Sequence, residues 1–204
     1  MRVAGRAFGS VAEGGAAIVV PGHLEDVRVG FHAFDADPAG TARTDADGQL
    51  VSLEDQDRGL WDADRIAEGR NLLLAALRGP ATGPYAIQAA IAAVHAEAAS
   101  TATTDWPQIV ALYDVLAHLS PSPVVQLNRA VAVAMRDGPQ AGLAALDTLH
   151  DEALRDYHPL PAARADLLRK LGRTTEAAAA YRAALELASN ERERAFLRKK
   201  LTEL

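Results

Sequence analysis

The sequence predicts an all-α protein in which about eight helices form an array, preceded by a short irregular or weakly β N-terminal segment. Three observations lead to this prediction. Apolar residues recur at helical spacing from residue 55 to the C-terminus, and Pro and Gly separate the stretches in which they do so. Only 5% of the 204 residues are aromatic, so the core must be built from Ala, Leu and Val, whose small side chains suit closely packed helices.

Residues 1–40 are expected to lie outside the helical domain, which we place at residues 41–204. The N-terminal segment is rich in Gly and has turn signals but no helical periodicity. His32, Asp35 and Asp37 could be taken for metal ligands. No second ligand cluster accompanies them, so a solvated loop is favoured.

Residues 44–53 predict a small turn with extended residues on both sides. Its sequence from Asp45 to Gly48 resembles the opening of a calcium loop. The glycine comes too early for an EF-hand, and no bidentate Glu follows at the required spacing. We therefore expect a tight turn closed by Gly48.

Start and stop signals divide the remainder into helices. Gly79-Pro80 ends the first, Thr104 or Asp105 caps the third, and Ser122 caps the fourth, which has Pro123 at its first position. Thr174 or Thr175 is the expected cap of the seventh helix. The predicted helices span residues 55–78, 84–99, 106–119, 123–136, 139–149, 161–171, 175–188 and 191–204.

Composition excludes several classes of site. The chain has no Cys, so it has no disulfide, thiolate zinc site or cysteine nucleophile. No apolar run approaches about 18 residues, so no membrane contact is expected and the cytoplasm is the expected location.

The net charge is −6. Because Pro159–Leu204 carries 10 basic and 6 acidic residues, the rest of the chain is strongly acidic, and direct sequence-specific DNA binding is not expected. The basic residues at the C-terminus are expected to complement the dipole of the last helix.

Gly138 and Gly172 lie 34 residues apart, and each stands between two predicted helices. A helix–turn–helix unit of this period is typical of tetratricopeptide repeats. In the second copy, Ala177 and Ala184 are expected at close helix contacts, with Tyr181 filling the groove between neighbours. The first copy departs from the pattern in its second helix, at Asp147 and His150. A generic Ala-rich bundle is the alternative. Arrays of the repeat type bind other proteins on extended concave surfaces.

A longer set of ordered motifs is spread along the chain from residue 45 to residue 197, and the likeness that they carry covers about four fifths of the chain. These motifs are residues 45–48 (DADG), 53–58 (LEDQDR), 61–62 (WD), 83–85 (GPY), 88–93 (QAAIAA), 95–97 (HAE), 104–106 (TDW), 122–125 (SPVV), 127–132 (LNRAVA), 161–168 (PAARADLL) and 190–197 (NERERAFL). Together they resemble the C-terminal extension of bacterial extracytoplasmic-function RNA polymerase sigma factors. In that group a tetratricopeptide-like region follows the promoter-reading domains.

The resemblance implies a non-enzymatic regulatory domain that contacts a protein partner, either sigma-factor domains or RNA polymerase. Neither the helical domain that reads the −10 element nor the helix-turn-helix domain that reads the −35 element is visible in the sequence. Residues 1–40 fall outside the likeness.

Several polar and aromatic residues are candidates for an interaction or structural role: Trp61, His95, Trp106, Asn128, Arg129 and Arg164. Asn128 and Arg129 interrupt an apolar pattern, so we expect them to bond a neighbouring helix, in the layer of Trp61 or His95. His95 and Glu97 could form an acid–base pair, but residues two apart on a helix point to different sides.

The acidic cluster Glu54, Asp55, Asp57, Asp62 and Asp64 could hold a cation, although capping of the first helix is favoured. We expect no catalytic residue, cofactor or metal. The rival hypothesis is a small helical enzyme or ligand-binding protein with a pocket between the first three helices, near His95 and Arg129.

Overall fold

The computed structural model describes residues 42–46, 48–78, 83–149 and 152–204. The N-terminal segment lies outside these residues, together with its possible metal ligands His32, Asp35 and Asp37, and so do Asp47 and His150. Within the described ranges, no helix has the length and apolar character needed to span a bilayer.

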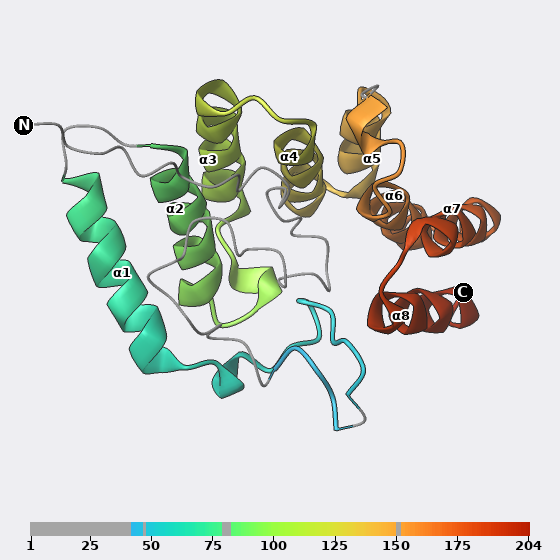
Figure 1. The fold of residues 1–204 in the computed structure, drawn as a ribbon, viewed down its shortest axis with the longest axis horizontal. Helices are drawn as coiled ribbons and strands as arrows, with labels where there is room; N and C mark the ends of the chain where they lie inside the picture. Colours follow the sequence, from blue (N-terminus) through green and yellow to red (C-terminus); the bar gives the residue numbers. More distant parts are fainter. Residues whose placement is uncertain (1–41, 47, 79–82, 150–151) are drawn as a thin grey trace, which may run out of the picture.

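The predicted all-α fold is confirmed for the described residues, which form eight α-helices in succession (Figure 1). Three short 3₁₀ helices accompany them: Arg58–Leu60 precedes the first α-helix, and Thr101–Thr103 and Glu152–Leu154 stand between α-helices. The α-helices are α1 (Ala63–Leu77), α2 (Pro84–Glu97), α3 (Trp106–Leu119), α4 (Pro123–Asp137), α5 (Pro139–Asp147), α6 (Pro159–Lys170), α7 (Thr174–Leu187) and α8 (Glu191–Thr202).

Each helix packs mainly on the next one in the chain, so the helices form a curved row rather than a closed bundle (Figure 1). The two turns that carry the 34-residue spacing both need a backbone conformation that favours glycine. Gly138, between α4 and α5, has φ 96°, and Gly172, between α6 and α7, has φ 72°. These glycines therefore allow the chain to reverse sharply into the following helix.

Five predicted helix starts agree with the structure and three differ, among them that of the sixth helix, which begins at Pro159 rather than about Pro161. The first helix begins at Ala63 rather than near residue 55, because the Asp62 carboxylate accepts hydrogen bonds from two backbone amides of the first turn and caps the helix there. The seventh begins at Thr174 itself, with Arg173 at the cap position and no side-chain cap bond. Asp105 caps α3 through the amide of Gln108, as one of the two predicted alternatives.

The turn predicted between residues 44 and 53 is present. Thr44 and Leu50 form an isolated antiparallel bridge, and Gly48 between them has φ 74°. The Gly48 amide donates to the Asp45 carbonyl, which closes the turn. The chain then enters residues 52–58, which position the candidate site.

The core consists of small and branched apolar side chains, as the composition requires. A shift of 34 residues pairs Val131 with Ala165, Val133 with Leu167, Ala134 with Leu168 and Leu143 with Ala177. All eight side chains are buried. In the second copy Tyr181 is 3% exposed and packs with Ala165, Ala184 and Leu197. These four pairs of equivalent positions are thus buried alike, as the repeat hypothesis requires, whereas Asp147, the equivalent of Tyr181, has a side chain that is 58% exposed.

Candidate interaction site

Arg58 ties the loop of residues 52–58 to the end of α2. Its guanidinium donates hydrogen bonds to the carbonyls of His95 at 2.6 Å and Ala98 at 2.8 Å. These carbonyls have no helical partner of their own, because α2 stops at Glu97. The guanidinium also lies 5.0 Å from the centre of the Trp61 ring, and burial lowers the pKa of Arg58. Arg58 therefore caps α2 while holding Trp61 against the helices.

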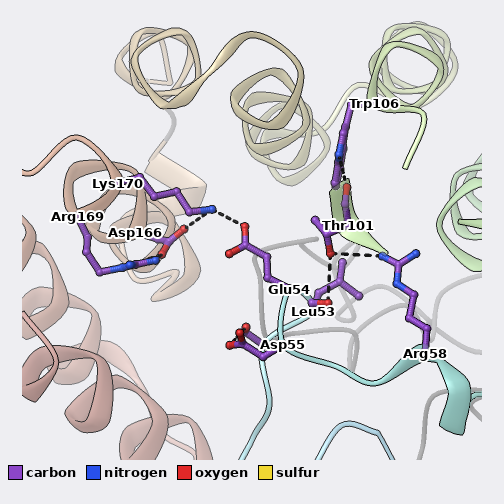
Figure 2. A network of polar contacts seen from close by, with 10 residues as sticks. Leu53, Glu54, Asp55, Arg58, Thr101, Trp106, Asp166, Arg169 and Lys170 are labelled. Carbon is purple, nitrogen blue, oxygen red and sulfur yellow. Dashed lines mark hydrogen bonds and ion pairs between the residues drawn. The ribbon is translucent and has the colours of Figure 1, made fainter. Parts of the chain in front are cut away.

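Thr101 links the same loop to the start of α3 (Figure 2). Its hydroxyl donates to the Leu53 carbonyl at 3.3 Å, and the Arg58 guanidinium donates to that hydroxyl at 3.4 Å. The carbonyl of Thr101 accepts a hydrogen bond from the Trp106 indole at 3.0 Å. Trp106 is therefore a positioning residue, because it holds the connection between α2 and α3 against residues 53–58.

Glu54 points the other way, toward α6 (Figure 2). Its carboxylate lies 2.5 Å from the Lys170 ammonium, which is also 3.3 Å from Asp166. Asp166 accepts a second bond from Arg169 at 2.7 Å. Burial opposes the charge of Lys170, but the Asp166 and Glu54 carboxylates outweigh it and raise the pKa of Lys170. One loop thus contacts both α2 and α6, which are far apart in the row of helices.

His95 is buried beside this loop and is only 3% exposed. Its ring meets the Trp106 ring edge-on, with centroids 5.2 Å apart. Among the described residues, neither of its ring nitrogens has a hydrogen-bond partner, and the Trp61 indole nitrogen has none. Burial, and then the charge of Arg58, lower the pKa of His95 to about 4, so the ring is neutral near pH 7. Glu97 is exposed, so the two residues face different sides, as expected.

The expected contact of Arg129 with the Trp61 or His95 layer is wrong. Arg129 extends from α4 to Asp114 of α3, at 2.5 Å. Asp114 lies eight residues after Trp106, so this ion pair is about 12 Å along α3 from the Trp106 layer. Asn128 is 1% exposed within α4. His95 and Arg129 therefore do not form one polar site.

Arg164 pairs with Asp147 at 2.6 Å and so joins α6 to the end of α5. Asp147 is one of the two positions at which the first copy departs from the repeat pattern. Where the repeat pattern has an aromatic side chain, Asp147 forms this ion pair instead. The Arg164 and Asp147 side chains are 35% and 58% exposed, so the ion pair contributes little to stability.

The acidic cluster acts in capping and pairing rather than as one group. Asp57 and Asp62 cap the helices that follow them, Asp55 accepts from Ser52, and Glu54 pairs with Lys170. In the parts of the chain that the structure describes, no three His, Asp or Glu side chains are grouped to hold a metal. A hollow of about 10 Å³, room for a single water molecule, lies between α4 and α6 and is lined by Val131, Ala134, Met135, Ala163, Asp166, Leu167 and Lys170.

Comparison with known proteins gives two matches. Residues 39–77 match a family of unknown function, DUF6596. An uncharacterized protein of Rhizobium meliloti (strain 1021) is 48% identical over 163 residues, which are 80% of this chain and 38% of that protein. The chain therefore spans well under half the length of this relative. No solved structure matches the chain.

Two contacts of the site were not predicted from the sequence. Glu54 and Lys170 lie too far apart in the chain for spacing to pair them. Arg58 belongs to the motif at residues 53–58 (LEDQDR), but its partners are backbone carbonyls, which leave no pattern of residue types in the sequence.

Proposed function

We propose that this chain is a regulatory protein-interaction domain related to the C-terminal extension of extracytoplasmic-function sigma factors. It acts in transcription initiation, in the cytoplasm, through contacts with sigma-factor domains or RNA polymerase. The observation that carries the proposal is the open row of helix pairs, in which each helix packs mainly on its neighbour. Arrays built in this way leave long surfaces uncovered and use them to bind proteins.

The residues that carry the family likeness support the proposal. Arg58, Trp106 and Arg164 belong to three separate motifs, and each makes a contact between elements of the array. The likeness therefore falls on residues that link one element of the array to another. A family that shares them would share the shape of the array and the surfaces it exposes.

The length of the matched relative supports the same reading. The matched stretch is 38% of the Rhizobium meliloti protein, so that protein has room for further domains beside it. A helical array attached to other domains is well placed to control them through direct contact. We propose that this contact, rather than DNA binding by the array, is the route of regulation, since the chain outside its C-terminal helices is strongly acidic.

The test uses the part of the Rhizobium meliloti protein outside the matched stretch, expressed separately. We expect this part to bind purified core RNA polymerase, and we expect addition of the present chain to change that affinity several-fold. The affinity is measured by fluorescence anisotropy, with the fluorescent label on the separately expressed part of the Rhizobium meliloti protein. An unchanged affinity at saturating concentrations of the chain would rule out the proposed regulation.

A further inference from the structure

Large apolar side chains are exposed mainly at one edge of the array. Among the described residues, seven large hydrophobic side chains are exposed, and six of them lie on α1, α2 and α3. We call this set the apolar edge: Leu72, Leu74, Leu77, Tyr85, Val115 and Leu119, each between 42% and 56% exposed. The seventh, Leu60, precedes α1.

The topology brings three of these residues, Leu77, Tyr85 and Leu119, to the same end of the three helices. Leu74 and Val115 lie about one turn before the ends of α1 and α3, and Leu72 lies further back on the other flank of α1. Consecutive helices run in opposite directions, so the end of α1, the start of α2 and the end of α3 meet at one edge, which is uppermost in Figure 1. Leu77 is the last residue of α1, Tyr85 the second of α2 and Leu119 the last of α3. Isolated exposed apolar residues are ordinary, but a group at one edge is typical of a binding surface.

Among the described elements, helix α1 packs mainly on α2, with one side of the helix. Its single fully buried residue is Gly69, and Ile66 and Leu73 on the same stripe are half-buried. At 100° per residue, Leu72 falls on one flank of this stripe, and Leu74 and Leu77 on the other. The apolar arc of α1 is therefore wider than α2 can cover, which leaves leucines for a further element to bury.

The stretch from Asn71 to Val94, which holds the residues of the apolar edge on α1 and α2, has little charge and that charge is basic, although the chain as a whole carries a net charge of −6. From Asn71 to Val94 the only charged residue is Arg78. Arg70, one turn before Leu74, is also exposed, and none of the ion pairs among the described residues involves Arg70 or Arg78. An occupant with acidic residues beside an apolar stripe would complement this surface.

We infer that the apolar edge binds an amphipathic helix whose apolar stripe is flanked by Asp or Glu, supplied by a sigma-factor domain. The inference rests on the proposed function, which provides that partner. The length of the relative supports this choice, because more than half of the Rhizobium meliloti protein lies outside the stretch that matches this chain. In the 48% identical relative, the domain that binds this surface would then belong to the same polypeptide chain as the surface itself.

The experiment measures binding of the full chain to the part of the Rhizobium meliloti protein outside the matched stretch, by isothermal titration calorimetry. We expect Leu74→Glu and Leu77→Glu each to weaken binding by about tenfold or more, because each places a charge in a desolvated apolar contact. Both side chains are exposed, so helical circular dichroism and thermal stability should stay the same. Leu77→Met should bind like the wild type, and so should Ala183→Glu, a charge added on the exposed face of α7.

The arginines are tested by the double variant Arg70→Glu with Arg78→Glu. It should weaken binding several-fold at about 50 mM salt, and the loss should shrink at about 500 mM because exposed charges are screened. If the wild type binds and the leucine variants bind equally well, the surface inference is overturned and the proposed function stands. No binding by the wild type would overturn both. A dimer of this chain that Leu77→Glu dissociates, seen by sedimentation velocity, would mean that a second copy is the occupant, contrary to the inference.

Discussion

The Glu54 carboxylate and the Lys170 ammonium lie 2.5 Å apart, although 116 positions separate the two residues in the chain. The pair joins the loop before α1 to the end of α6. The same loop, through Arg58, caps α2. Residues 52–58 therefore form a brace that links α2 to α6 across the row of helices.

The Glu54–Lys170 pair should contribute measurably to stability because its side chains are 32% and 24% exposed, less than those of the Arg155–Glu152 surface pair. We expect Lys170→Met to lower the free energy of unfolding by about 1 kcal/mol, and a double-mutant cycle with Glu54→Gln to assign most of that loss to the pair. Hydrogen exchange should also become faster at residues 44–53. The control is Arg155→Met, which breaks an exposed ion pair with Glu152 and should change little. Independent, additive effects of the two substitutions would contradict the brace.

The sequence predicted the helices well because their signals are local. Asp105 caps α3, and Pro123 starts α4, as their types and positions indicate. Those signals also compete: the acidic run before α1 offered several possible starts, and only the structure shows that Asp62, rather than an earlier carboxylate, caps the helix. The Glu54–Lys170 brace and the Arg129–Asp114 pair depend on which helices become neighbours in space. No spacing within a single helix specifies that.

The role of Gly142 could not be predicted from the sequence either, because it depends on which helix lies next to α5. Within a helix, a glycine by itself indicates only a loss of helix stability. A Cβ built on Gly142 would lie 2.2 Å from the Ala134 Cβ and 2.9 Å from its Cα. The glycine is what allows α5 to lie close against α4. We therefore expect Gly142→Ala to destabilise the protein by about 1–3 kcal/mol through overpacking, although alanine favours helix formation.

The matched control for this substitution is Gly83→Ala. Gly83 has a negative φ, and a Cβ added to it would meet no other side chain or backbone atom within 4 Å, so the change should be close to neutral. Urea unfolding of both variants gives the comparison. Equal midpoints would show that α4 and α5 can move apart without cost.

The second copy of the repeat should depend on Tyr181. Truncating this buried aromatic, Tyr181→Ala, should cost about 3–5 kcal/mol and increase hydrogen exchange first in α6, α7 and α8, because the end of an array is held mainly by its neighbours. Ala184→Glu should do similar harm by forcing a charge into a buried helix contact. Ala183→Glu, one residue earlier on the exposed face, is the control. Unchanged protection of these helices in the Tyr181 and Ala184 variants would favour a generic bundle over the repeat.

The last prediction concerns the pH dependence of stability at His95. In the unfolded chain a histidine takes up a proton near pH 6.5, whereas burial and Arg58 lower the pKa of His95 to about 4 in the folded protein. Between these values the unfolded state binds the extra proton, so stability falls as the pH decreases through this window. The full loss is about 3 kcal/mol, reached near pH 4, and above pH 6.5 the contribution is constant.

His95→Leu should remove this part of the pH dependence. It should cost little at pH 7, because neither ring nitrogen has a hydrogen-bond partner among the described residues and an apolar side chain leaves no polar atom buried there. The control is His118→Gln, at an exposed position of α3, which should keep the wild-type slope. The measurement is urea unfolding at pH values from about 4 to 8 for all three proteins. A His95→Leu protein that loses stability between pH 6.5 and 4 as steeply as the wild type would show that another group controls the acid sensitivity.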